Sequence, residues 1–301
     1  MPIEQISPEL ERIVSVDTEM EELGSGYGGD PGPTEGPLWW KEGGYLLFSD
    51  IFNDRRMKWT PSEGVSVHQE GTNRANGLTR DLQGRLLACE HDGRRVTRQE
   101  PDGTITVIAD SYLGKRLNSP NDVVVKSDGS IYFTDPPFGL PNYSEGKELD
   151  FQGVYRVSPD GELTLLLDDM ERPNGLAFSP DESILYINDS ARRHIRAFDV
   201  DPNGMPDLAT DRVFCDLAGE RPGVPDGMKA DVEGNVYCGG SGGLWIMDSS
   251  GKHLGIIVPG VIMLTNMAWG GEDLKTLFVT TRHTLRRIQL KIPGIPVPAG
   301  N

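Results

Sequence analysis

One short pattern recurs six times along the chain and constrains the fold more than any other feature. Each copy begins with Asn, Asp or Glu, continues through an apolar stretch and a turn, and ends in a second β-rich run. The copies begin at residues 35, 76, 121, 174, 226 and 266, so their starts are separated by 41, 45, 53, 52 and 40 residues. This spacing is typical of β-propellers, in which each repeat is one four-stranded antiparallel sheet around a central channel. We therefore predict an all-β fold, a six-bladed β-propeller.

The repeats use almost the whole chain and leave residues 1–34 and 282–301 outside them. We expect these two terminal segments to supply strands that close one blade. Since closed all-β folds often use about 300 residues as one unit, residues 1–301 are expected to form a single six-bladed propeller domain. The longest excursion between strands, residues 136–151, is rich in Pro, Gly and charge and is predicted to be a loop over one face.

The first residues of the six copies all carry side-chain oxygen. Because equivalent positions of successive blades converge on the axis of a propeller, we expect these side chains to surround one mouth of the channel. Hard cations such as Ca²⁺ take oxygen ligands, whereas Zn²⁺ sites favour His and Cys. The two carboxylates of the set would neutralise a divalent ion, so we predict a metal at this mouth. The six residues are Glu35, Asn76, Asn121, Asn174, Asp226 and Asn266.

Simpler explanations exist for several of these side chains. The pairs Asn76-Gly77, Asn174-Gly175 and Asp226-Gly227 also favour tight turns that need no metal. His91 could reach the same mouth or could only stabilise the turn in which it lies.

Two further groups of residues are candidate sites. Asp50, Asp135 and Asp189 close three apolar runs and could form a second, structural cation site, although exposed carboxylates closing strands are the commoner outcome. Ser241 lies in a G-x-S-x-G sequence, but the following LWIMD is predicted to be a strand. A nucleophile elbow requires a helix there, so we do not expect a catalytic serine.

Composition limits the partners and the compartment. The formal net charge is −17, which makes the long-range field repulsive to nucleic acid and to anionic membrane surfaces. No stretch of about 18 apolar residues and no secretory signal pattern is found, so a cytoplasmic location is expected. The three cysteines, Cys89, Cys215 and Cys238, match no disulfide or zinc pattern and are predicted to be buried thiols.

Four motifs resemble those of one known family over approximately residues 30–285. Glu35–Trp39 matches an E-G-P-x-W motif, Pro173–Asp181 matches P-N-G-[LI]-A-x-S-P-D, and Pro225–Met228 matches P-D-G-[ML]. Asn121-Asp122 matches an N-D pair. The chain therefore resembles the senescence-marker-protein/gluconolactonase (regucalcin-like) family of calcium-dependent lactonases, which are six-bladed propellers. The S-P-N-D form at Ser119–Asp122 resembles its bacterial members.

The resemblance implies an activity and a set of site residues. It implies hydrolysis of a lactone, a sugar lactone or related cyclic ester, by a metal that polarises the carbonyl while water attacks. Glu35, Asn174, Asp226 and Asn121 would bind the metal, Ca²⁺ in the first place, with Zn²⁺, Mn²⁺ or Mg²⁺ as possible substitutes. Asp226 would be catalytic, as base or as positioner of the water. Asn121, Asn76 and His91 would contact a small-molecule lactone.

Two other functions stay open at this point. Phosphotriester hydrolysis at the same metal is plausible from the family's relatives, paraoxonase and diisopropylfluorophosphatase. Alternatively, the propeller could be a non-catalytic interaction module whose calcium ion is only structural.

Overall fold

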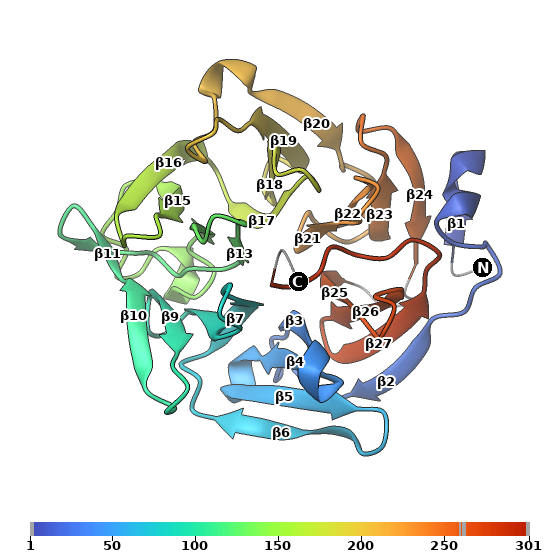
Figure 1. The fold of residues 1–301 in the computed structure, drawn as a ribbon, viewed down its shortest axis with the longest axis horizontal. Helices are drawn as coiled ribbons and strands as arrows, with labels where there is room; N and C mark the ends of the chain where they lie inside the picture. The colour runs from blue at the N-terminus through green and yellow to red at the C-terminus, as the bar shows by residue number, and fades with distance from the viewer. Residues whose placement is uncertain (1–2, 259, 261–262, 299–301) are drawn as a thin grey trace.

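The repeats form six antiparallel sheets that surround a central channel (Figure 1). The computed structural model describes residues 3–258, 260 and 263–298. In each sheet the strand that follows the first residue of a repeat is innermost, and the later strands lie progressively further out. The predicted all-β, six-bladed propeller is confirmed.

The blades follow one another along the chain. Blade 1 contains β3 (Thr34–Trp40), β4 (Tyr45–Asp50), β5 (Arg55–Thr60) and β6 (Gly64–Glu70). Blade 2 contains β7 (Ala75–Arg80), β8 (Leu86–Glu90), β9 (Arg95–Gln99) and β10 (Ile105–Ala109). Blade 3 contains β13 (Val123–Val125), β14 (Ile131–Asp135), β15 (Gln152–Val157) and β16 (Leu163–Met170). Blade 4 contains β17 (Pro173–Phe178), β18 (Ile184–Asp189), β19 (His194–Asp199) and β20 (Arg212–Asp216).

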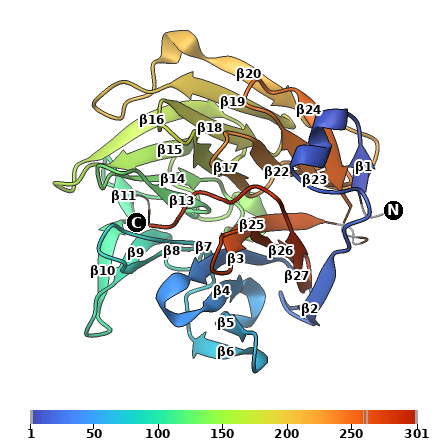
Figure 2. The ribbon, with the colours of Figure 1, turned by 45° about the vertical axis from the view of Figure 1, so that its right-hand side comes forward.

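The last two blades take up strands from the N-terminal segment. Blade 5 contains β21 (Met228–Ala230), β22 (Val236–Gly240), β23 (Gly243–Met247) and β24 (His253–Ile257), with β1 (Ile3–Gln5) at its outer edge. Blade 6 contains β25 (Leu264–Gly270), β26 (Thr276–Thr281) and β27 (Thr284–Gln289), and its outer strand is β2 (Glu21–Ser25). The N-terminal segment therefore contributes to two neighbouring blades, with β2 beside β27 and β1 beside β24 (Figure 2).

Short elements complete the described chain. A small hairpin pairs β11 (Ser111–Tyr112) with β12 (Lys115–Arg116). The described helical segments are all short 3₁₀ helices, and none of them is long and apolar enough to cross a membrane. These helices are η1 (Pro8–Arg12), η2 (Lys41–Gly43), η3 (Ile51–Asn53), η4 (Pro141–Tyr143) and η5 (Leu208–Thr210).

Apolar packing between neighbouring blades holds the ring together. The described residues contain six apolar clusters, and each of them lies between two adjacent blades. Phe133, Tyr186 and Tyr237 are almost completely buried on second strands, and burying one such side chain contributes about 2–3 kcal/mol. Both faces of every blade are thus covered by its neighbours, so the blades depend on one another for stability. The three cysteines are buried and unpaired, as predicted.

Candidate active site

The six oxygen-bearing residues that open the repeats converge on the channel axis at the start of the inner strands. We call Glu35, Asn76, Asn121, Asn174, Asp226 and Asn266 the donor ring; all six are buried. In four blades the pairing of the first two strands shifts register at or beside the donor-ring residue. Such β-bulges re-aim a side chain relative to the regular pleat. The tight-turn interpretation is wrong for Asn76 and Asn174, which lie within β7 and β17.

Glycines next to the donor ring allow adjacent inner strands to approach closely. A Cβ on Gly36 would collide with the carbonyl oxygen of Asn76, and one on Gly175 would collide with that of Asp226. A Cβ on Gly77 would lie 2.6 Å from the carbonyl oxygen of Asn121. The small residue that follows the donor in most repeats is therefore explained by contact with the next blade.

We expect Gly36→Ala to destabilise the protein by about 2 kcal/mol or more, because the new methyl group meets backbone and the φ of +53° is unfavourable for Ala. Denaturant unfolding would measure the loss. As a control, Gly103→Ala also has positive φ but meets no atom within 4 Å, so it should show only the smaller conformational cost. Equal losses in the two variants would contradict the inter-blade explanation.

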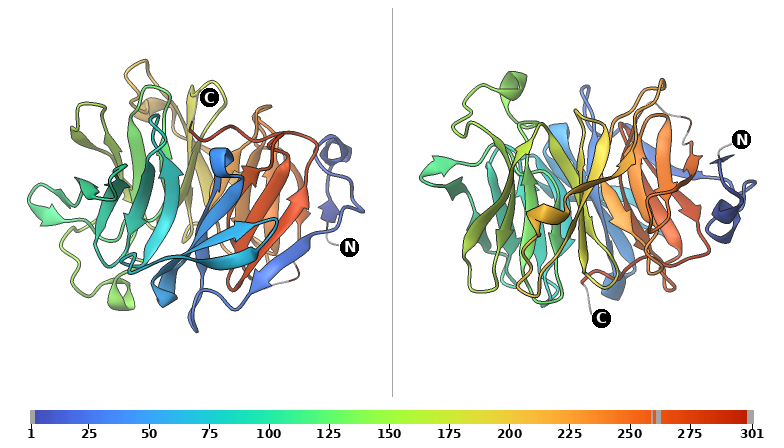
Figure 3. Two further views of the ribbon diagram at one scale, coloured as in Figure 1. Left: turned by 60° about the horizontal axis from the view of Figure 1, so that its bottom comes forward. Right: turned by 90° about the horizontal axis from the view of Figure 1, so that it is seen from above.

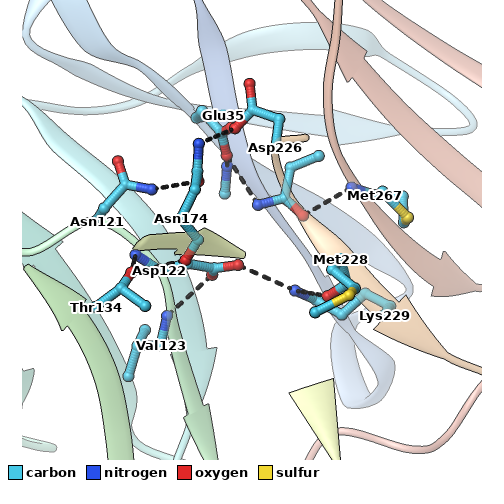
Figure 4. Close-up of polar contacts among 12 residues, drawn as sticks. Glu35, Asn121, Asp122, Val123, Thr134, Asn174, Asp226, Met228, Lys229 and Met267 are labelled. Atoms are coloured by element: carbon cyan, nitrogen blue, oxygen red, sulfur yellow. Dashed lines mark hydrogen bonds and ion pairs between the residues drawn. The ribbon is translucent and has the colours of Figure 1, made fainter. Parts of the chain in front are cut away.

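Hydrogen bonds link the members of the donor ring, and Figure 4 shows those that join Asn121, Asn174 and Asp226. Asn76 Nδ2 donates to Asn121 Oδ1 at 2.6 Å, and Asn121 Nδ2 donates to Asn174 Oδ1 at 2.6 Å. Asn174 Nδ2 donates to Asp226 Oδ1 at 2.9 Å. Asn266 Nδ2 donates to Glu35 Oε2 at 2.9 Å on the other side. Side chains far apart in the sequence therefore meet at one point of the channel.

Two buried carboxyl groups adjoin each other in the ring. Burial, followed by the charge of Asp122, raises the pKa of Glu35 to about 7. Burial and the neighbouring Glu35 raise the pKa of Asp226 well above its usual value. Both shifts arise because negative charge at this point is poorly compensated by the protein.

The donor set fits a hard cation. Besides the two carboxyl groups it offers amide oxygens, and Asn76 Oδ1 is buried without any hydrogen-bond partner. The described part of the chain contains no group of three or more His, Cys, Asp and Glu side chains that could hold a metal. A cation here would therefore need amide oxygen in addition to Glu35 and Asp226, which is a ligand mixture that suits Ca²⁺ better than Zn²⁺.

His91 belongs to this site. Its Nε2 lies 3.1 Å from Asn76 Nδ2, and since an amide NH₂ can only donate, Nε2 must accept. Burial lowers the pKa of His91 to about 4, which keeps the ring neutral. His91 also stabilises the turn in which it lies, because the Arg94 N–H donates to the His91 carbonyl oxygen. Contact with the donor ring and stabilisation of the local turn are thus both compatible with the structure.

The loop of residues 136–151 packs beside His91. Gly139 lies so close that a Cβ there would be 2.6 Å from His91 Cβ. The hydroxyl of Ser119 fastens the loop, since it donates to the Pro136 carbonyl oxygen at 2.6 Å and accepts from the Gly139 N–H at 2.9 Å. In the edge-on views this loop and the C-terminal segment lie at opposite faces of the propeller (Figure 3).

Second strands supply supports that the sequence analysis missed. Ser49 Oγ donates to the carbonyl oxygen of Asn76 at 2.7 Å, and Thr134 Oγ1 donates to that of Asn174 at 2.7 Å. Asn188 Nδ2 donates in the same way to the carbonyl oxygen of Asp226. Each support holds the donor-ring residue of the next blade. A signal was available, because each support directly precedes the Asp that closes its strand.

The interpretation of Asp50, Asp135 and Asp189 as exposed carboxylates is wrong. Among the described residues they also form no group of three that could hold a metal, so the structure does not support a second cation site. All three are completely buried, and each sits in its own blade. Their carboxylates accept backbone N–H groups, for example from Gly28 at 2.6 Å and from Asn118 at 2.7 Å. They fasten the segments that lead into the inner strands.

Ser241 makes only a structural contact. Its hydroxyl donates to the carbonyl oxygen of Arg221 at 2.7 Å, and the strand β23 follows it. The expectation that no nucleophile elbow forms here is therefore confirmed.

An ion pair lies beside the donor ring. Lys229 Nζ is 3.5 Å from Asp122 Oδ2, and Figure 4 shows both residues next to the ring. Lys229 also lines a cavity of about 590 Å³ at the far ends of the inner strands, where Trp39, Phe178 and Trp269 contribute apolar surface. Ile295 and Val297 of the C-terminal segment line the same cavity.

Comparison with known proteins shows a consistent picture. Residues 33–283 match the family described as SMP-30/Gluconolactonase/LRE-like region. A gluconolactonase of Zymomonas mobilis is 37% identical over 97% of this chain and 87% of that protein. The pentonolactonase XacC of Haloferax volcanii is 28% identical over 82% of this chain and 80% of that protein. The solved structure of XC5397 from Xanthomonas campestris, described as a gluconolactonase, has a TM-score of 0.83 and 34% identity, and the match covers 96% of this chain and 95% of that one.

Proposed function

Because the chain belongs to the SMP-30/gluconolactonase/LRE-like family, we propose that it is an enzyme that hydrolyses sugar lactones at the donor ring. The observation that carries the proposal is the contact of two buried carboxyl groups within a ring of amide oxygens. The names of the gluconolactonase and pentonolactonase relatives support a lactone of an aldonic acid as substrate.

The donor ring fits a divalent cation, Ca²⁺ first and Zn²⁺, Mn²⁺ or Mg²⁺ as substitutes. Glu35, Asn174 and Asp226 would hold it, together with Asn121. When bound, it would supply Lewis-acid polarisation of the lactone carbonyl. Its positive charge also suits the site, since the protein itself leaves Glu35 and Asp226 poorly compensated.

Asp226 is the proposed base or water positioner. In its ionised form the carboxylate would accept a proton from the attacking water. The water oxygen bonds to the carbonyl carbon, the ester bond to the ring oxygen breaks, and that oxygen takes up a proton to give the open hydroxy acid.

The amide groups would orient the substrate. Both hydrogens of Asn76 Nδ2 are already engaged, by His91 and Asn121. Asn76 therefore has only its free Oδ1 to offer, so we assign it as an acceptor for a substrate hydroxyl and not as a donor to the carbonyl. Asn121 Nδ2 donates one hydrogen to Asn174 Oδ1, and we assign its second hydrogen to the lactone.

A pH-stat survey tests this function directly. The chelator-treated protein would be assayed with aldonolactones, dihydrocoumarin and a phosphotriester, each with added Ca²⁺, Mn²⁺, Mg²⁺ or Zn²⁺. We expect hydrolysis of sugar lactones that EDTA abolishes and a divalent ion restores. Preferential cleavage of the phosphotriester would favour the second enzyme function, and failure to hydrolyse any ester would favour the interaction module.

A further inference from the structure

We infer that Asp122 and Lys229 act as two opposed charges beside the donor ring, and that each of them tunes the affinity and selectivity of the ring for the charge of the bound cation. The inference rests on the proposed function, because it assumes that the donor ring binds a metal. It assigns a role to two residues that supply no ligand in the proposed set.

The pair joins two blades that are not neighbours. Asp122 directly precedes β13 of blade 3, whereas Lys229 lies in β21 of blade 5, and blade 4 stands between them. The carboxylate of Asp122 is buried and receives the Val123 N–H at Oδ1, while its Oδ2 has no hydrogen-bond partner and faces Lys229 Nζ at 3.5 Å. The ammonium group also donates to the carbonyl oxygen of Met228 at 3.0 Å. The contact is therefore mainly electrostatic.

The charges around the ring leave an excess of two negative charges when all carboxyl groups are ionised. Glu35, Asp122 and Asp226 contribute the negative charges, and Lys229 contributes the positive one. Both members of the pair lie close to the ring, since Asp122 directly follows Asn121 and Lys229 comes three residues after Asp226 (Figure 4). An excess of two is matched by one divalent cation.

Removal of either charge should change cation binding in opposite directions. Lys229→Met leaves an excess of three negative charges, which should tighten Ca²⁺ binding and should tighten binding of a trivalent lanthanide still more. Asp122→Asn leaves an excess of one negative charge and should weaken the binding of both ions. Lys229 borders the solvent-accessible cavity, so its charge is partly screened, and we expect changes on the order of tenfold in Kd. A merely structural role predicts weaker binding in both variants.

The experiment measures cation binding without catalysis. The full-length, chelator-treated protein and its variants would be titrated with Ca²⁺ by calorimetry and with Tb³⁺ by luminescence. The double variant Asp122→Asn/Lys229→Met restores an excess of two charges and should bind Ca²⁺ nearly as the unaltered protein does. Lys126→Met is the matched control, because Lys126 also forms ion pairs, with Glu182 at 3.1 Å and with Asp128. The Kd of this variant for Ca²⁺ should be unchanged.

Three outcomes would overturn the inference. The first is weaker binding in both single variants, and the second is an unchanged Kd in both. The third is the absence of cation binding to the unaltered protein, which would remove the metal from the proposed function as well. Lactone assays on the same preparation then show whether hydrolysis itself survives. If Lys229→Met loses its fold by circular dichroism, Lys229→Gln makes the same change in charge.

Discussion

Asp226→Asn is expected to lower kcat/KM for a sugar lactone by about a thousandfold or more, which corresponds to roughly 4 kcal/mol of lost transition-state stabilisation. The amide has nearly the same shape as the carboxylate, but it cannot accept a proton from water and it removes one of the two charges that would bind the cation. Initial rates at saturating Ca²⁺ measure the loss. A rate close to that of the unaltered protein would refute the assigned role of Asp226.

The same substitution should not weaken the metal-free fold. Burial and the neighbouring Glu35 raise the pKa of Asp226, which disfavours its ionised form in the folded state. Removal of that charge should leave Tm in EDTA unchanged or raise it. Asp216→Asn is a suitable control, because Asp216 is exposed at the end of β20 and its replacement should affect neither activity nor Tm. A large fall in Tm for Asp226→Asn would mean that activity was lost through misfolding.

Much of this architecture was predictable because every blade of a propeller has the same packing requirements. Every blade must bury two faces and bring one residue to the axis, so the same apolar runs and the same opening side chain recur from Glu35 to Asn266. The convergence of the donor ring followed from that periodicity. The placement of β1 in blade 5 did not follow, since a strand of three residues at a sheet edge leaves little trace in the sequence.

The missed parts of the site depend on contacts between different repeats. The supports Ser49, Thr134 and Asn188 act on the following blade, so their role is invisible when each repeat is considered alone. The same is true of Asp122 and Lys229, which meet across a blade that separates them in sequence. The aspartates that close second strands were expected to be exposed. They are buried because the backbone N–H groups of entering segments need acceptors.

The stability of the metal-free protein should fall as the pH rises, because the pKa of Glu35 is raised in the folded state. Its folded-state pKa, about 7, is above the ordinary value of 4.5, so its stabilising contribution is fully present below pH 4.5 and is lost as the pH rises through 7. We expect Tm in EDTA to fall between pH 5 and pH 8. The shift in the pKa of Glu35 corresponds to roughly 3 kcal/mol in the free energy of unfolding, or on the order of 5–10 °C in Tm.

Calcium should oppose this trend. A bound cation stabilises the ionised carboxyl groups, and protons compete with the cation for those groups, so calcium binds more tightly at higher pH. The rise in Tm on addition of Ca²⁺ is therefore expected to be larger at pH 8 than at pH 5.5. Differential scanning calorimetry of the unaltered protein and of Glu35→Gln, with EDTA or Ca²⁺ at both pH values, separates this group from the general repulsion of a chain with a net charge of −17. In EDTA, Glu35→Gln should lose the part of the pH dependence that Glu35 causes. Parallel curves for the two proteins, or a calcium effect independent of pH, would show that Glu35 does not link protonation to metal binding.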